Sequence, residues 1–519
     1  MVTSGMGDSA TEDIDAGAVA AVWLCALEEA LSLGQAFAVT ELFEPDGYWR
    51  DQLSFTWNLR TLHGSEAIRD MLEERLVVVG PGEFRLDGPE PVIQPLGEDR
   101  QCVQAVFRFS TAYGGGRGVV RLVQAGEDDA RWRAWTLLTA LHELRGYEER
   151  IGSRRPVGLA EGTETFVPWR EERQLQREFA DTDPTVVIVG AGQAGLAIGA
   201  RLGALGVSAL IVDTNERVGD NWRGRYRNLV LHDPVWYDHF PYLPFPPNWP
   251  VFAPKDKMGD WLESYANVME INVWTGTRFD GGFYDTEAGR WEVTVTRSGG
   301  VRRSLRPRHV VLATGVSGSP RIPDLPGIDG FGGETVHSSR FTDGVRWANR
   351  RAVVVGAGNS GHDIAMELHQ SGADVTMVQR SSTYVVSRDN GQAIFAGLYE
   401  ENGPSTEDAD LLNASLPLDV VRAMFVQVTA ALAEQDKELL DGLRARGFLV
   451  GFGEDGSGLM FNLLSRLGGY TIDTGASSLI AEGKVKLASG AGPRQFTRDG
   501  VELDDGRHLG ADLVVFATG

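Results

Sequence analysis

Residues 352–365 read AVVVGAGNSGHDIA, and residues 186–198 read VVIVGAGQAGLAI. In each stretch an apolar run predicts a strand, a glycine-rich turn follows it, and the next residues begin a helix. A strand, a GxGxxG turn and a helix in this order are typical of a dinucleotide-binding unit, because backbone N–H groups at the turn and the helix start can receive a pyrophosphate. The chain therefore contains two such units.

The residues that end the second strand of each unit differ in charge. SALIVD ends in Asp213, and an acid there accepts hydrogen bonds from the free ribose of a cofactor such as FAD. DVTMVQRSS instead supplies Arg380 and Ser381, which suit the 2′-phosphate of NADPH. The alternatives are a glycine turn without a ligand and an exposed arginine after a strand. The predicted cofactor-binding residues of the two turns are Gly190, Gly192, Gly195 and Asp213 for FAD, and Gly356, Gly358, Gly361, Arg380 and Ser381 for NADPH.

The size, net charge and cysteine content of the chain exclude several classes of protein. At 519 residues the chain is too long for one hydrophobic core, and its net charge of −23 disfavours nucleic-acid binding. The two cysteines, Cys25 and Cys102, have no metal-ligand spacing, so we expect buried thiols and no metal site. The acidic, polar N-terminus is unlike a signal peptide and no stretch is long enough to span a membrane, which predicts a cytoplasmic protein.

The residue pattern changes along the chain and predicts several domains. Alternating apolar and polar residues between Cys102 and Thr111 indicate a half-buried antiparallel strand, whereas the strand–turn–helix order after Pro184 indicates a parallel sheet. The predicted fold is an α/β flavoprotein with two Rossmann-like dinucleotide-binding domains, preceded by an α+β domain. We expect the α+β domain over residues 14–148, a linker over 149–183, the FAD domain over 184–330 and the NADPH domain over 331–506, with a helical insertion at about 391–467 and a strand over 507–519 that returns to the FAD domain.

FGGETVHSSRF, residues 331–341, matches the pattern FxGxxxHxxx(Y/F) through Phe331, Gly333, His337 and Phe341. By this motif the chain resembles the flavin-containing monooxygenases, the class B flavoprotein oxygenases, over about two thirds of its length. RVGDNW resembles the family's GGxW segment near the flavin, and ATGVSGSPRIPDLPG matches a further family segment. The resemblance thereby adds Gly219, Trp222, Thr314 and Gly315 to the expected cofactor-binding residues, while Asp220 departs from the second glycine of GGxW.

The resemblance implies that NADPH reduces FAD and that a C4a-hydroperoxyflavin then transfers one oxygen atom of O₂ to a small organic substrate. His232 lies where heteroatom-oxidising members usually have asparagine and where the plant YUCCA-type enzymes, which oxidatively decarboxylate a keto acid, have histidine. We therefore expect His337 and His232 to be catalytic, although a turn-stabilising and a core histidine are the respective alternatives. Baeyer–Villiger enzymes usually have Trp followed by Pro or Asp where this chain has Phe341 and Thr342, which favours heteroatom or YUCCA-like oxygenation; a Baeyer–Villiger reaction is the alternative.

Residues 14 to about 145 resemble the NTF2-like and SnoaL-like domains, in which helices lie on a curved sheet. Asp46, Asp51 and His63 are candidates for acid–base chemistry there, but we favour a structural or substrate-guiding role. Trp49, Phe55 and Trp57 are expected in the core, and a homodimer through this domain is a further expectation. Relatives continue beyond the segment that matches Gly519, so we expect a truncated C-terminus; a non-catalytic nucleotide-binding protein with an NTF2-like binding module is the alternative function.

Overall fold

A computed structural model describes residues 14–97, 100–126, 129–158, 167–316 and 318–519. Most of the acidic N-terminal stretch considered above lies outside these residues. The chain forms two compact units, which we describe separately. Unit 1 comprises Met1–Glu148 and Gly397–Val421, and unit 2 comprises Glu149–Ala396 and Arg422–Gly519.

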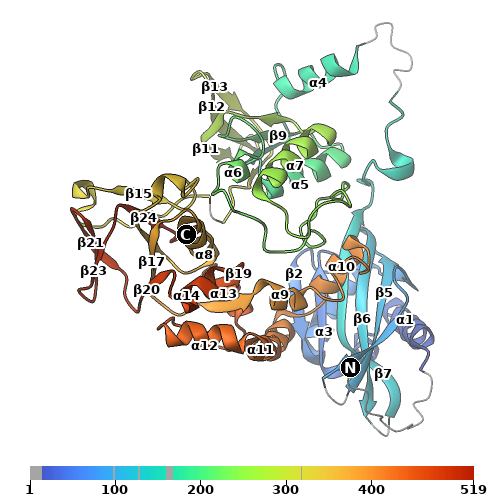
Figure 1. The fold of residues 1–519 in the computed structure, drawn as a ribbon. Helices are drawn as coiled ribbons and strands as arrows, with labels where there is room; N and C mark the ends of the chain where they lie inside the picture. Colours follow the sequence, from blue (N-terminus) through green and yellow to red (C-terminus); the bar gives the residue numbers. More distant parts are fainter. Residues whose placement is uncertain (1–13, 98–99, 127–128, 159–166, 317) are drawn as a thin grey trace. The chain divides into compact units, whose positions relative to one another are not determined.

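Unit 1 is built on a seven-stranded sheet with the order β2-β1-β7-β6-β5-β3, in which β4 also pairs with β5 (Figure 1). β1 runs parallel to β7, and the other neighbours are antiparallel. The helices and strands expected between residues 14 and 145 are therefore present. Their bounds are α1 Ala16–Ser32, α2 Ala36–Thr40, β1 Phe43–Gln52, β2 Leu59–His63, α3 Gly64–Val79, β3 Gly82–Leu86, β4 Val92–Leu96, β5 Arg100–Ser110, β6 Gly114–Gly126 and β7 Asp129–Leu144.

Both faces of strand β5 are covered, although its sequence pattern predicts a half-buried strand. The apolar residues at alternate positions, such as Phe107 and Phe109, belong to the core that α1, α2 and α3 share with the sheet. On the opposite face Val106 packs against Leu412 of α10 (Thr406–Ala414). The helical insertion expected at 391–467 is thus divided, because its residues 397–421 belong to unit 1.

Unit 2 begins with a first module of three layers. Its parallel sheet has the order β10-β9-β8-β14. Ile188 of β8 packs against helices α5 and α7, whereas its neighbour Val187 packs against the antiparallel sheet β11-β12-β13. The bounds are α4 Trp169–Glu178, β8 Val186–Val189, α5 Gln193–Ala204, β9 Ala209–Val212, α6 Asp220–Arg223, α7 Lys255–Val268, β10 Val273–Trp274, β11 Thr277–Asp285, β12 Arg290–Arg297, β13 Arg302–Leu305 and β14 His309–Leu312.

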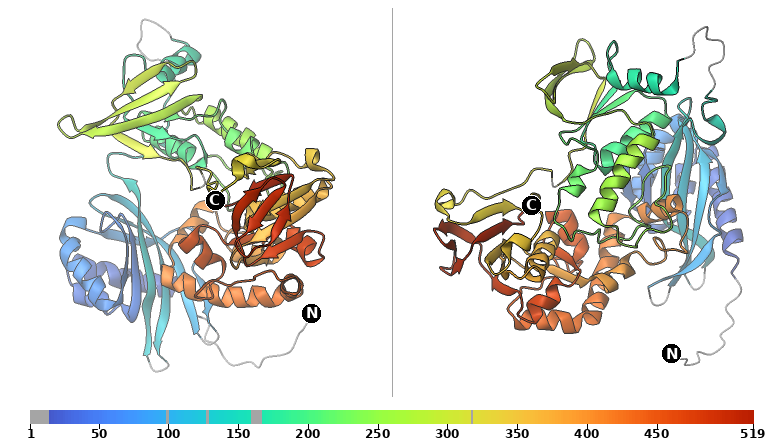
Figure 2. Two further views of the ribbon diagram at one scale, coloured as in Figure 1. Left: turned by 90° about the vertical axis from the view of Figure 1, so that its left-hand side faces the viewer. Right: turned by 45° about the horizontal axis from the view of Figure 1, so that its top comes forward.

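A second module repeats this plan (Figure 2). Its sheet, β15-β24-β16-β17-β20, contains the order β20-β17-β16-β24 that corresponds to β10-β9-β8-β14. Val354 faces helix α8, and Val353 faces the small antiparallel sheet β21-β22-β23. The bounds are β15 Glu334–His337, β16 Arg351–Val355, α8 Asn359–Gln370, β17 Asp374–Gln379, β18 Tyr384–Ser387, α9 Arg388–Gly391, α11 Leu418–Gln435, α12 Lys437–Ala445, α13 Leu459–Arg466, β19 Tyr470–Asp473, α14 Ala476–Ala481, β20 Lys486–Ser489, β21 Pro493–Thr497, β22 Gly500–Leu503, β23 His508–Gly510 and β24 Leu513–Phe516.

One expectation about chain organisation is wrong. The strand expected to return to the first module within residues 507–519 is β24, which instead pairs with β15 and β16 of the second module. Its residues are buried against both outer layers of that module, which explains why it stays there. The linker expected over 149–183 contains helix α4, whose Arg177 carbonyl accepts a 2.7 Å hydrogen bond from Trp274 Nε1.

In the described part of the chain, no single helix is long and apolar enough to span a membrane. Helices α10 and α11, which are bent relative to each other, reach that length and apolar character only when they are taken together.

Candidate active site

The first glycine turn leaves one open position. Gly190 has φ +108°, and a Cβ atom there would lie 2.4 Å from the Ala313 carbonyl oxygen. A Cβ at Gly195 would lie 2.0 Å from the Gly190 oxygen, so side chains are excluded at both positions. At Gly192 the nearest atom is Asn221 Nδ2 at 3.7 Å. The middle of the turn is therefore open to a phosphate, as the GxGxxG fingerprint requires.

The second glycine turn has the same construction. Gly356 has φ +118° and its Cβ would lie 2.3 Å from the Ala517 oxygen, while a Cβ at Gly361 would lie 2.1 Å from the Gly356 oxygen. At Gly358 the nearest atom is the Tyr470 oxygen at 3.5 Å. The middle glycine is again the position with room for a ligand, so both turns fit a dinucleotide.

The strand ends beside the two turns differ in the way that the sequence predicts. Asp213 follows β9 and accepts hydrogen bonds from the backbone N–H groups of Ala191, at 2.7 Å, and Asn215, at 2.8 Å. Its carboxylate is therefore fixed next to the first turn. Arg380 and Ser381 follow β17 and are both exposed, with no acid in the corresponding position. The first site thus carries a carboxylate and the second a guanidinium group.

The segment after β14 contacts the residues that follow β24. Ala313 and Ala517 each contact the first glycine of their own turn, through the carbonyl oxygens described above. Beyond them, the Arg321 N–H donates to the Gly519 oxygen at 2.9 Å, and Thr518 Oγ1 donates to the Arg321 oxygen at 2.7 Å. Thr314 and Gly315 are exposed at the end of β14. The similar ATG segments thus lie at equivalent places beside the two turns.

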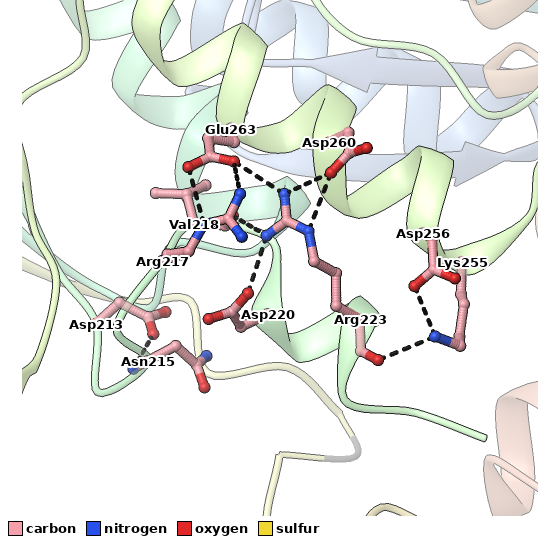
Figure 3. Close-up of polar contacts among 10 residues, drawn as sticks. All are labelled: Asp213, Asn215, Arg217, Val218, Asp220, Arg223, Lys255, Asp256, Asp260 and Glu263. Carbon is pink, nitrogen blue, oxygen red and sulfur yellow. Dashed lines mark hydrogen bonds and ion pairs between the residues drawn. The ribbon is translucent and has the colours of Figure 1, made fainter. Parts of the chain in front are cut away.

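Helix α6 carries the residues of the predicted flavin segment. Gly219 has φ +91°, and a Cβ there would lie 2.2 Å from the Gly259 oxygen of α7. Trp222 Nε1 is buried without a hydrogen-bond partner. Figure 3 shows that Arg223 joins this helix to carboxylates of α7. A buried indole donor without a partner is costly, and an acceptor atom of a bound cofactor would satisfy it.

His337 ends β15 and stabilises the turn that follows it. Its Nδ1 accepts the Ser339 N–H at 3.1 Å, and its carbonyl oxygen accepts the N–H of Phe341 at 3.1 Å. Burial lowers the pKa of His337, although a hydrogen bond with the Gly519 backbone acts in the opposite direction. Its Nε2 atom is buried. The structure thus supports the turn-stabilising interpretation of His337.

His232 lies against the helix that follows the second glycine turn. Its Nε2 is 3.4 Å from Asp363 Oδ2, and both side chains are almost fully buried. Burial acts to lower the pKa of His232, but the hydrogen bond and charge of Asp363, together with the charge of Asp233, outweigh it and raise the pKa. The two candidate histidines therefore have pKa values shifted in opposite directions, a pattern found where groups have different proton-transfer roles.

Asp363 is the centre of a contact that the sequence did not reveal. Its Oδ2 accepts the Tyr226 hydroxyl at 2.7 Å, and its backbone oxygen accepts Asn228 Nδ2 at 3.1 Å. One turn later in α8, Glu367 Oε2 accepts the Asn228 N–H at 3.2 Å. Helix α8 of the second module thereby holds residues 226–232 of the first. The only available signal was Asp363 itself, two residues after the last glycine of the fingerprint.

Asp238 lies in the same segment as His232. Its Oδ2 atom is buried without a hydrogen-bond partner. Burial, reinforced by the negative charge of Asp233 and opposed by His239, raises the pKa of Asp238 to about 7. A carboxyl group with this pKa exchanges a proton near neutrality, which makes Asp238 a candidate that sequence reasoning missed.

The acid–base candidates of unit 1 have structural surroundings. Asp51 is fully buried, and His63 and Asp46 are exposed. Trp49 and Phe55 lie in the core as expected, but Trp57 does not, with 46% of its surface exposed. Cys102 is buried and free, whereas Cys25 is exposed, contrary to expectation. The Asp51 carboxylate accepts hydrogen bonds from the hydroxyls of Ser54, Thr56 and Thr139 and from the N–H groups of Phe55 and Thr56.

Comparisons with known proteins agree with the two glycine turns. The sequence profile described as pyridine nucleotide-disulphide oxidoreductase matches residues 184–402. Both cysteines lie outside that match, so a disulphide-reducing cysteine pair is absent from it. Within the described residues, no group of three or more His, Cys, Asp or Glu side chains is arranged to hold a metal ion.

Plant enzymes are similar to about two thirds of this chain. The indole-3-pyruvate monooxygenase YUCCA1 of Oryza sativa subsp. japonica is 31% identical over 337 residues, which cover 65% of this chain and 76% of that protein. The probable indole-3-pyruvate monooxygenase YUCCA4 of Arabidopsis thaliana is 31% identical over 340 residues, covering 65% and 75%.

Solved structures share the fold at lower identity. Cyclohexanone monooxygenase with bound epsilon-caprolactone has a TM-score of 0.50 at 20% identity, covering 65% of this chain and 73% of that one. OTEMO in complex with FAD and NADP also has a TM-score of 0.50 at 20% identity, covering 65% and 71%.

Proposed function

This chain belongs to the family of flavin-dependent monooxygenases that contains the plant indole-3-pyruvate monooxygenases, and from that membership we propose which residues carry out its reaction. It is an NADPH- and O₂-dependent flavin monooxygenase, as the sequence predicted, and its cofactors are FAD and NADPH. When bound, these cofactors supply hydride transfer and the activation of O₂.

The first glycine turn holds FAD and the second holds NADPH. The observation that carries this assignment is the difference between two turns of the same construction: Asp213 is fixed beside the open position at Gly192, whereas Arg380 follows the strand beside the open position at Gly358. A carboxylate favours free ribose hydroxyls and repels a 2′-phosphate, which a guanidinium group binds. Gly219, Trp222, Thr314 and Gly315 complete the FAD site, and Ser381 contributes a hydroxyl to the NADPH site.

The substrate is a 2-oxo acid, which loses its carboxyl group as CO₂ when one oxygen atom is inserted. The names of the plant relatives and the presence of His232 support this class over heteroatom oxidation. In the balanced reaction the 2-oxo acid, O₂, NADPH and one proton give the shortened acid, CO₂, water and NADP⁺. A Baeyer–Villiger oxidation is the second candidate, and the shared fold with cyclohexanone monooxygenase is its only support.

His232 and His337 divide the proton-handling and binding roles. Asp363 lies beside Nε2 of His232 and helps to raise the pKa of this imidazole, and its protonated form suits an anionic substrate or a developing negative charge. His337 presents its buried Nε2 as a hydrogen-bonding group. Helix α8 keeps His232 in place through Asp363, so Asp363 is a positioning residue.

Unit 1 is an NTF2-like domain with a structural or substrate-guiding role. Helices α1, α2 and α3 on one face of a largely antiparallel sheet support the fold, and the buried, hydrogen-bonded Asp51 supports the absence of acid–base chemistry at that residue. Because α10 covers the sheet face that contains Val106, a homodimer would form through another surface of this domain. The use of NADPH supports a cytoplasmic location.

An assay of three substrates tests the substrate class. The purified protein with FAD, NADPH and O₂ is given indole-3-pyruvate, phenylpyruvate or the thioether thioanisole, and CO₂, the shortened acid and the sulfoxide are measured. The account predicts CO₂ and the shortened acid from both 2-oxo acids in amounts matching the NADPH consumed. Sulfoxide formation without decarboxylation would instead assign heteroatom oxidation.

A further inference from the structure

Helix α6 is only four residues long, and one arginine fastens it to helix α7. Arg223 Nη1 donates to Asp220 Oδ1 and to the Val218 oxygen, each at 2.9 Å. Its Nε and Nη2 donate to Asp260 Oδ1 at 3.1 and 2.9 Å, and Nη2 also reaches Glu263 Oε2 at 3.0 Å. Figure 3 shows the guanidinium group between these carboxylates. Arg223 therefore links both ends of the segment to α7.

The backbone packing of α6 depends on this link. Gly219 and Gly259 allow the two segments to approach, because a Cβ at Gly259 would lie 2.7 Å from Arg223 Cγ and one at Gly219 would lie 2.2 Å from the Gly259 oxygen. Lys255 Nζ adds a 3.0 Å hydrogen bond to the Arg223 oxygen. A helix of four residues has no stability of its own, so tertiary contacts determine where its side chains lie.

Helix α6 presents one polar side chain to the first glycine turn. Asn221 is exposed, and its Nδ2 is the nearest atom, at 3.7 Å, to the Cβ position of Gly192. That position is the open part of the turn, where a pyrophosphate approaches. An amide N–H is a donor, and a hydrogen bond to a charged phosphate oxygen is stronger than one between neutral groups.

Asp220 adds a charge that the family pattern lacks. Relatives with GGxW have glycine where this chain has Asp220, next to the residue that faces the turn. An isolated carboxylate there would repel a pyrophosphate. The side chain of Arg223 pairs with Asp220 at 2.9 Å and is itself only 16% exposed. Arg223 thus offsets part of the negative charge that Asp220 brings near the turn.

We propose that Asn221 donates a hydrogen bond to the pyrophosphate of FAD and that Arg223 is the positioning residue that holds Asn221 there. This inference rests on the proposed assignment of FAD to the first glycine turn. It gives the chain an additional cofactor-binding residue and explains how the Asp220 replacement is compatible with a bound dinucleotide.

The first experiment changes the charge at Asn221. Apoprotein of the wild type, Asn221→Ala and Asn221→Asp is titrated with FAD by quenching of flavin fluorescence. We expect Asn221→Ala to raise the Kd for FAD about tenfold and Asn221→Asp about a hundredfold, because the latter replaces a donor with a like charge. Binding of NADP⁺, measured by calorimetry, should not change. Equal Kd values for FAD in all three proteins would overturn the proposal.

The second experiment tests positioning with a matched control. Arg217 donates to the same Glu263, at 2.6 Å, but has 57% of its side chain exposed, and its guanidinium group pairs with α7. We expect Arg223→Gln to raise the Kd for FAD about tenfold and Arg217→Gln to leave it unchanged. If Arg223→Gln lowers the Tm of the apoprotein while FAD binds as tightly as before, Arg223 has only a structural role and that half of the proposal fails.

The titration of the wild type with FAD distinguishes a failure of the proposed function from a failure of the inference about α6. A wild-type protein that does not bind FAD contradicts the proposed function itself. A wild type that binds FAD, with Asn221→Asp binding it equally well, contradicts only the inference about α6. Because Asn221 is exposed, its variants are expected to fold, and they keep the proposal testable even if Arg223→Gln does not.

Discussion

Replacing the middle glycine of either turn with alanine should weaken the binding of one cofactor and leave the binding of the other unchanged. The apoprotein has room for the methyl group, since the nearest atoms to the added Cβ are 3.7 Å away at Gly192 and 3.5 Å away at Gly358. Both glycines are in extended backbone, so alanine is not strained there. We therefore expect the free energy of unfolding of the apoprotein to change by less than about 1 kcal/mol in either variant.

The same methyl group lies where the phosphates must approach the backbone. Losing or lengthening one hydrogen bond to a charged phosphate costs about 1.5–3 kcal/mol, which corresponds to roughly 10- to 150-fold in Kd. Gly192→Ala should weaken FAD by this factor and Gly358→Ala should weaken NADP⁺. Gly195→Ala is the contrasting variant, because its Cβ would lie 2.0 Å from the Gly190 oxygen and should lower the Tm of the apoprotein itself.

Flavin fluorescence titration, NADP⁺ calorimetry and thermal unfolding of the apoprotein measure these effects separately. Loss of FAD from Gly358→Ala with normal FAD binding by Gly192→Ala would exchange the two sites. Normal binding of both cofactors by both variants would show that the dinucleotides do not approach these turns. Either result would refute the reasoning from the open positions.

Three further predictions concern charge. Arg380→Gln should raise KM for NADPH about tenfold or more without raising KM for NADH, measured by steady-state oxidation of each; equal effects on both would argue against a 2′-phosphate contact. The pKa of His232 is higher in the folded protein than in the unfolded chain, where it is about 6.5. The pairing of His232 with Asp363 therefore stabilises the protein fully below about pH 6.5, and this stabilisation is lost as the pH rises through the folded pKa. We expect His232→Gln to lower Tm more at about pH 6 than at about pH 9. The pKa of Asp238 is raised to about 7 in the folded protein, so the wild type loses stability as the pH rises from about 4 to 7. Asp238→Asn should therefore raise the free energy of unfolding by on the order of 2–4 kcal/mol at about pH 8 and by much less at about pH 4. A difference between the two proteins that does not depend on pH would contradict this prediction.

Local patterns predicted the parts of the fold that local physics determines. The strands before the turns, the turns themselves and the helices after them are present because apolar runs, glycines and helix starts are close in sequence. The inner face of β5 was predictable for the same reason, since its alternation has a period of two residues.

Contacts between distant segments were not predictable from one sequence. The docking of Leu412 on Val106 needs residues about three hundred positions apart, and nothing in the β5 pattern reveals it. Strand β24 resembles β14 in sequence, and β14 belongs to the first module. The sequence therefore does not reveal which sheet β24 joins, and only the observed pairing with β16 assigns it to the second module. The same limitation concealed Asp363, whose partners Tyr226 and His232 come from the first module.

Departures from the family pattern pointed to the parts of the site that are particular to this chain. Asp220 is one example, because its negative charge near the first glycine turn is explained only by its ion pair with Arg223. His232 is another, since its acidic neighbours determine its protonation and are not adjacent in sequence, apart from Asp233.

An anaerobic spectrum of the purified protein tests the central claim, that one turn holds FAD and the other passes hydride to it from NADPH. The account predicts a flavin absorbance band that NADPH bleaches at least about tenfold faster than an equal concentration of NADH, and that returns when air is admitted. In Arg380→Gln that preference should largely disappear while the flavin remains bound. A colourless protein, or a bound flavin that NADPH does not reduce, would contradict the claim.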